Sequence, residues 1–134
     1  MLNIGYQTTS TVTITFSEPV SKADLQLHDI TAIRTGGQNQ YGRYVDRIAL
    51  DQPWSMTGDM QAANKTVGNA GEYFERTADS PSNHKAWLNT MSTRGQSPFT
   101  SLTLTYSAPS AVFGDATRCG WQFIAIGNID FCLA

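Results

Sequence analysis

The stretch Thr11-Val12-Thr13-Ile14-Thr15-Phe16 decides the fold class, because its polar and apolar residues alternate strictly. Successive side chains of a β-strand point to opposite faces of a sheet, so this pattern predicts a strand with one apolar face and one threonine-covered face. In a helix, residues three and four apart share a face, which would mix the two kinds of side chain. The β-branched residues of this stretch also favour a pleated strand.

The same alternation recurs along the chain, separated by segments rich in Gly, Pro, Asn and Ser. The segments that carry it are Asp24–Ile30, Val45–Asp51 and Phe99–Ser107. The segment Trp121–Phe131 is apolar at both odd and even positions, which predicts a central strand covered on both faces. Together these signals predict an all-β fold, an antiparallel jelly-roll β-sandwich of about eight strands with little helix.

The length and the charge of the chain argue against several classes of function. A chain of 134 residues fits one domain, residues 1–134, and strand patterns close to both ends suggest a module of a larger protein. Only 15% of the residues are charged and the net charge is −2, which argues against nonspecific nucleic-acid binding. No apolar run approaches 18 residues, so membrane insertion is not predicted.

Five segments occur in an order that resembles a known kind of module. They are Val12–Val20, Leu25–Ile30, Tyr44–Ile48, Ser101–Ser107 and Ile126–Cys132. The set resembles jelly-roll β-sandwich modules of bacterial cell-surface, adhesin-type multidomain proteins. The resemblance implies an extracellular or cell-surface location, but it fixes no ligand, because such folds carry many functions.

Catalysis finds no support in the sequence. There is no Gly-x-Ser-x-Gly, no His-Glu-x-x-His and no glycine-rich phosphate loop. We therefore predict no catalytic residues and no enzymatic activity.

Four aromatic residues in polar segments form a predicted ligand-binding set: Tyr41, Tyr44, Trp54 and Trp87. Aromatic faces stack on the C–H surface of sugar rings, and neighbouring amides and carboxylates bind hydroxyl groups. The alternative is that the two tryptophans belong to the core, as large aromatic residues often do in a domain of this size.

Three carboxylates near strand ends, Asp29, Asp46 and Asp130, form a predicted structural calcium site, since Ca²⁺ prefers oxygen ligands. Arginines or backbone amides are the alternative partners, in which case no cofactor is bound. The two cysteines, Cys119 and Cys132, pair only if the chain between them folds back, because a disulfide needs Cα atoms about 5.5 Å apart.

These observations predict a non-catalytic extracellular recognition module, an adhesin or fibre tip that binds a glycan or protein on another cell surface. The alternatives are a structural spacer or cap of a surface fibre, and a carbohydrate-binding accessory domain of a polysaccharide-degrading enzyme. The sequence leaves open whether the module is a monomer or forms a homo-oligomer, such as a dimer or trimer, in a fibre.

Overall fold

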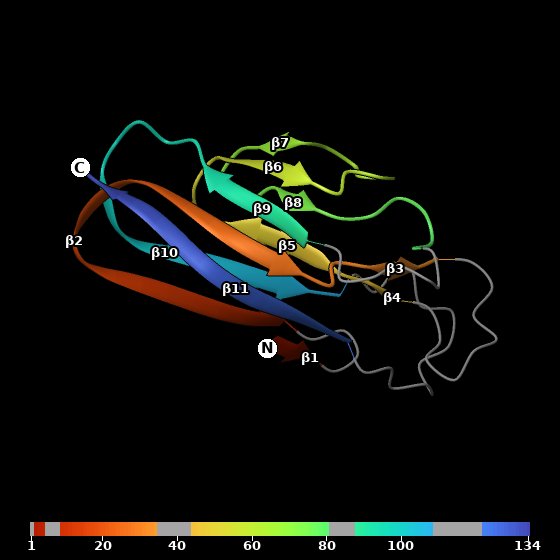
Figure 1. Cartoon of the computed structure of the whole chain (residues 1–134). Coiled ribbons are helices and arrows are strands. Elements are labelled where there is room, and N and C mark those ends of the chain that lie inside the picture. The colour runs from red at the N-terminus through yellow and green to blue at the C-terminus, as the bar shows by residue number, and fades with distance from the viewer. Residues whose placement is uncertain (1, 5–8, 35–43, 81–87, 109–121) are drawn as a thin grey trace.

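The chain forms an antiparallel all-β structure, seen in a computed structural model that describes residues 2–4, 9–34, 44–80, 88–108 and 122–134 (Figure 1). The described residues contain strands and turns but no helix. The strands are β1 (Leu2–Ile4), β2 (Thr9–His28), β3 (Ala32–Ile33), β4 (Tyr44–Val45), β5 (Arg47–Leu50), β6 (Trp54–Gly58), β7 (Val67–Gly68), β8 (Tyr73–Phe74), β9 (Leu88–Thr93), β10 (Phe99–Ser107) and β11 (Gln122–Leu133). The predicted all-β fold is confirmed.

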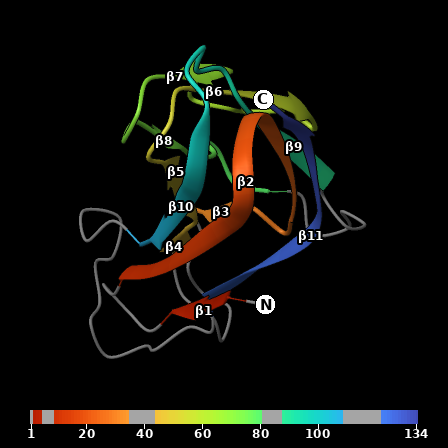
Figure 2. The same cartoon turned by 90° about the vertical axis from the view of Figure 1, so that its left-hand side faces the viewer.

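One long strand, β2, joins two layers of the sandwich. Its first half pairs with β10, which continues through β5 to β8. Its second half pairs with β9 on one side, leading to β6 and β7, and with β11 on the other. Figure 2 shows β2 arching over the end of the sandwich from one layer to the other. Consecutive strands from β7 to β11 then alternate between the layers, which is the wrapped connectivity of a jelly roll.

The bend of β2 lies at Glu18-Pro19, just after the alternating stretch Thr11–Phe16, where a proline is expected to end a strand. The strand pattern nevertheless continues from Thr9 to His28. Proline has no N–H to donate to a sheet ladder, and its carbonyl accepts a hydrogen bond from Ala134 N–H at 3.0 Å. A register shift in β10 between Phe99 and Ser101 accompanies the bend. Pro19 therefore marks the corner of the sandwich, as strands that change layers do at bends and bulges.

The core lies between the two layers and takes alternate residues from each regular stretch of strand. Along β2, the threonines of the first half are exposed, whereas Leu25 and Leu27 of the second half are fully buried. The predicted alternation of these segments is thus confirmed. The largest fully buried side chains are Trp54, Tyr106, Phe74, Leu25, Leu27, Ile30, Ile48, Leu50, Met91, Leu102, Leu104 and Ile124.

Strand β11 is not the doubly covered central strand that its composition predicted. Phe123 is 39% exposed, whereas its neighbour Ile124 is fully buried. The ladder to β2 shifts register between Ile126 and Ile129, where β11 carries one extra residue. Such a bulge moves the inward parity by one, from Ile124 and Ile126 before it to Ile129 and the residues beyond. Two successive one-sided segments therefore produced an apolar pattern on both parities.

Candidate binding site

Trp54, from the predicted ligand-binding set, is a core residue. It is fully buried in β6, its ring meets Phe74 edge-on at 6.3 Å between centroids, and its indole N–H donates to the carbonyl of Glu72 at 2.9 Å. A ligand that stacks on an aromatic ring needs an open ring face, which Trp54 does not offer. Tyr41 and Trp87 lie outside the described residues.

Tyr44 is half-buried at the end of the sandwich where β3 and β4 pair. Its hydroxyl lies 2.9 Å from the hydroxyl of Thr31, and burial raises the pKa of the Tyr44 phenol. The polar tip of this residue therefore joins a protein hydrogen-bond network. Among the described members of the predicted aromatic set, neither residue presents a fully exposed ring.

Asp46 is the centre of that network. Its carboxylate accepts hydrogen bonds from the Tyr106 hydroxyl at 2.6 Å, from the Thr31 N–H at 2.8 Å and from the Thr31 hydroxyl at 3.2 Å. Burial raises the pKa of Asp46 to about 7, against these hydrogen bonds, which favour the charged form, and Asp29 adds to the rise. Burial beside this carboxylate also raises the pKa of Tyr106.

The sequence analysis included Tyr106 only as part of the alternating segment Phe99–Ser107 and missed its contact with Asp46. The signal was present, because a tyrosine and an aspartate both fall on the inward parity of their strands. A buried carboxylate needs donors, and the phenol of a residue on the neighbouring strand β10 supplies one. Asp29 belongs to the same end of the molecule and adopts a left-handed backbone conformation with φ of 67°.

The three predicted calcium ligands are not brought together. Asp130 lies opposite Asp24 in the ladder between β11 and β2. At about 3.3 Å per strand residue, His28 is about 13 Å further along β2, and Asp29 follows it. In the described part of the chain, no three His, Cys, Asp or Glu side chains gather as a metal-holding group.

Arg76 is a buried residue that the sequence analysis did not single out. It forms hydrogen bonds with several segments in the irregular middle of the chain. Arg76 is 2% exposed, and its guanidinium donates to the carbonyls of Ile30, Asp59 and Gln61 and to the Asn89 side chain at 2.7–3.2 Å. The planar guanidinium, with five donors, suits this convergence of carbonyl groups. Its hydrogen bonds therefore join residues 30, 59, 61 and 89, from three segments that are far apart along the chain.

Cys132 is a free, exposed cysteine on β11. The second cysteine, Cys119, whose pairing with Cys132 the sequence left open, lies outside the described residues.

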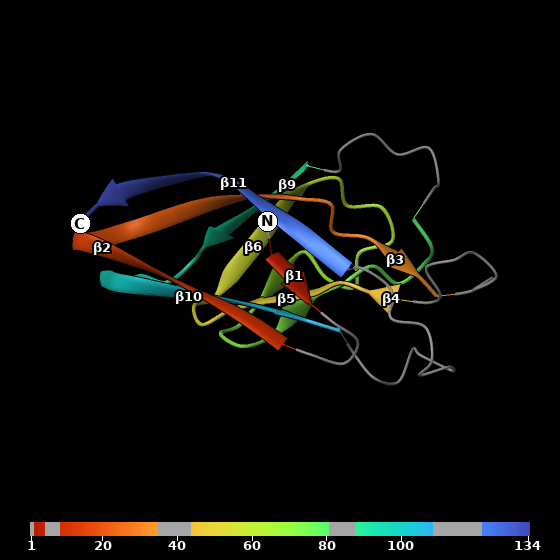
Figure 3. The ribbon, with the colours of Figure 1, turned by 90° about the horizontal axis from the view of Figure 1, so that it is seen from below.

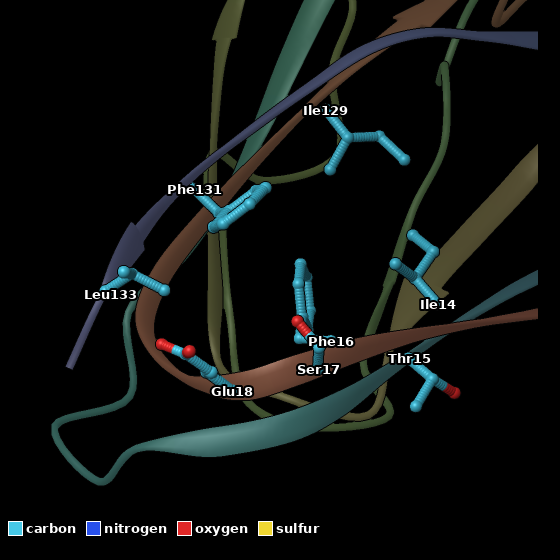
Figure 4. Close-up of a pocket in the computed structure, with 8 residues that line it drawn as sticks. All are labelled: Ile14, Thr15, Phe16, Ser17, Glu18, Ile129, Phe131 and Leu133. Atoms are coloured by element: carbon cyan, nitrogen blue, oxygen red, sulfur yellow. The ribbon is translucent and has the colours of Figure 1, made fainter.

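An open apolar cavity of about 320 Å³ lies between the first half of β2 and β11 (Figure 4). We call it the seam cavity, and its lining residues are Ile14, Thr15, Phe16, Ser17, Glu18, Ile129, Phe131 and Leu133. In Figure 4, Ile14 and Phe16 of β2 point toward Ile129 and Phe131 of β11. The two phenyl rings are 5.3 Å apart between centroids, so side chains rather than hydrogen bonds join the two strands here.

Two large apolar side chains that line the seam cavity are exposed to solvent. Phe131 is 54% exposed and Leu133 is 59% exposed, although both belong to the inward parity of β11 after the bulge. Phe131 faces Ala23 in the ladder, and Leu133 faces Val20, both fully buried residues of β2. The core of the sandwich is therefore open on this side, and exposed apolar groups of this kind mark interaction sites.

Sequence reasoning missed the seam cavity, because its two walls are far apart along the chain. Residues 14–18 and 129–133 meet only through the pairing of β11 with the second half of β2. The apolar character of both segments was visible, but their incomplete coverage was not.

No family model, curated protein or solved structure matches the chain. Within the described ranges, no helix has the length and apolar character to cross a membrane.

Proposed function

We propose that the domain is a non-catalytic recognition module of an extracellular or cell-surface protein, and that it binds a protein partner at the seam cavity. The observation that carries the proposal is the exposure of Phe131 and Leu133 beside Phe16 in a cavity of about 320 Å³. Interfaces concentrate aromatic and aliphatic side chains at their centre, where water is excluded.

The chemistry of the cavity favours a polypeptide over a glycan. Its floor is formed by apolar side chains, with Ile14, Phe16 and Ile129 partly buried beneath the more exposed rim. A sugar needs several polar groups aimed at its hydroxyls, and Glu18 is the single charged residue of this lining. The burial of apolar side chains of a protein partner in this cavity would instead lower the free energy of the complex.

Two screens run in parallel test the proposal. The purified domain is used to select binders from a random linear peptide library and is also applied to a glycan array. Each screen is repeated with Phe131→Asp, which puts a charge into the cavity, and with Thr11→Asp, which puts the same charge on the exposed threonine face.

We expect the peptide screen to yield apolar sequences that bind the wild type and Thr11→Asp but not Phe131→Asp. Circular dichroism and melting curves must show that both variants are folded. Glycan binding that survives Phe131→Asp, or peptides that bind all three proteins equally, would contradict the proposal.

The second candidate function is a structural module that spaces or caps a surface fibre. The burial of Trp54 favours this second function, because its ring packs in the core and has no face open to a ligand. It predicts that neither screen yields a ligand that distinguishes Phe131→Asp from the wild type.

A further inference from the structure

We infer that the partner binds as an added β-strand, an extended peptide that pairs antiparallel with β11 and places alternate apolar side chains in the seam cavity. The inference rests on the proposed function and specifies the chemistry of the partner. Three features carry it: an unpaired strand edge, an existing strand that shows the direction of pairing, and a carboxylate at one end of the cavity.

The unpaired edge belongs to β11. One edge of this strand pairs with β2 from Ala125 to Leu133, and β1 pairs with its beginning, Leu2 opposite Ile124 and Ile4 opposite Gln122. Among the described strands, none pairs with the other edge beyond Ile124. An exposed edge presents unpaired N–H and C=O groups, and another extended chain is the partner that satisfies them regularly.

This edge carries one of the usual protections against strand addition, the bulge between Ile126 and Ile129, but it lacks two others. Native edges commonly carry lysine or proline that disfavours pairing. The segment Ala125–Leu133 contains neither, and Asp130 is its single charged residue. Asp130 has the parity opposite to Phe131 and Leu133, so it lies away from the seam cavity.

Strand β1 already pairs with the start of β11, and the partner strand would continue this pairing. Figures 2 and 3 show β1 beside the start of β11, on the side that faces the first half of β2. The pairing of β1 with β11 is antiparallel. A partner strand in line with β1 would run along Ala125–Leu133 and cover the cavity, with its C-terminal end next to Leu2.

The charge at one end of the cavity selects the sequence of the partner. Leu133 lies opposite Val20, so the N-terminal end of an antiparallel partner would lie beside Glu18. Within the described ranges, the Glu18 carboxylate makes no ion pair. Neither lysine nor arginine is among the residues that line the seam cavity. A lysine, an arginine or a free amino terminus near the start of the partner strand is complementary to this carboxylate.

The test uses one synthetic peptide and a matched control. The peptide alternates valine and threonine, begins with lysine, and has an acetylated N-terminus and an amidated C-terminus. The control has the same sequence with alternate backbone nitrogens methylated, which removes main-chain donors and keeps the side chains. Binding is measured by calorimetry, and amide hydrogen exchange locates the protected residues of the domain.

We expect a dissociation constant on the order of micromolar, as for other small interfaces. Slowed amide exchange is expected in Ala125–Leu133. Methylation should weaken binding at least about tenfold, because several hydrogen bonds are lost together. Glu18→Gln should weaken binding about two- to fivefold, the size of an exposed ion pair, and should not weaken binding of a peptide that begins with glutamate.

A fused version gives an independent measurement. When the same peptide sequence is attached ahead of Met1, it continues β1 and fills the edge of β11 within one molecule. The fusion should melt at a higher temperature than the wild type and should no longer bind the free peptide.

Three results would overturn the inference. If the peptide and its methylated control bind equally and Phe131→Asp abolishes both, the proposed function stands but strand addition is wrong. If sedimentation shows that the wild type is a dimer and Phe131→Asp a monomer, a second copy fills the cavity instead. If no peptide binds and the library selects none, both the inference and the proposed function fail.

Discussion

Replacing Asp46 by Asn removes a deeply buried carboxylate whose ionisation the fold opposes. Asp46 is 1% exposed, and burial raises its pKa from 3.8 to about 7. The amide can keep the same contacts, with its oxygen accepting from Thr31 N–H and its nitrogen donating to the Tyr106 hydroxyl, which also accepts. The substitution therefore tests the cost of the charge rather than the loss of a hydrogen-bond partner.

The sign of the effect follows from the direction of the pKa shift. The folded protein holds the proton more tightly than the unfolded chain, so the associated stability is complete below about pH 4 and is lost as the pH rises toward 7. The shift of about 3 units corresponds to an upper limit of about 4 kcal/mol in the free energy of unfolding, at 1.36 kcal/mol per unit.

Urea unfolding of the wild type, Asp46→Asn and Asp130→Asn between about pH 4.5 and 7.5 measures this dependence. Below this window other carboxylates titrate, among them Glu72, whose pKa the Asn69 N–H lowers. We expect the wild type and the control Asp130→Asn, a change at an exposed position, to lose stability across the window. Asp46→Asn should lose much less, so that it is the most stable of the three at neutral pH.

Two results would refute this reasoning. A wild type equally stable at both ends of the window would show that Asp46 ionises without cost, through contacts that stabilise its charge. A parallel pH dependence in Asp46→Asn and the wild type would assign the loss of stability to a different group.

Three further predictions concern the packing described above, and each is tested by urea unfolding. Arg76→Met should lower the free energy of unfolding by about 3–5 kcal/mol, because it leaves several carbonyls without their donor; a loss below about 1 kcal/mol would mean that water replaces the guanidinium. Ile124→Ala should cost about 2–5 kcal/mol and more than Phe123→Ala, and the reverse order would contradict the inward parity assigned to β11. Gly68→Ala should cost about 1–3 kcal/mol, since a Cβ there would lie 2.4 Å from the Trp54 ring, whereas Gly95→Ala meets only the flexible Gln52 side chain at 3.2 Å and should be nearly neutral; equal effects would show that the indole can move aside.

The candidate site was less predictable than the fold, and particular residues show why. The sequence singled out Tyr44, Asp29 and Asp46, which do gather at one end of the sandwich around Thr31. It attributed to them ligand binding and metal binding, whereas the carboxylate of Asp46 accepts hydrogen bonds from Tyr106 and Thr31. A carboxylate on an inward parity shows that a partner is required, but the identity of that partner depends on which strand faces it.

The sequence by itself determined the strands in which polar and apolar residues alternate, and the faces that these strands bury. The alternation in Thr11–Phe16, Asp24–Ile30 and Phe99–Ser107 has a period of two residues, which is a local property of the extended backbone. It also determined the all-β class, because the β-branched residues and the turn-forming segments act over a few neighbouring positions.

Only the tertiary structure decided how these strands are arranged. The corner at Pro19 changes layers instead of ending a strand, and the bulge between Ile126 and Ile129 reverses the inward parity of β11. Both depend on hydrogen bonds to strands distant in sequence. The exposure of Phe131 and Leu133 was decided in the same way, because whether an apolar face is covered depends on which other strands reach it.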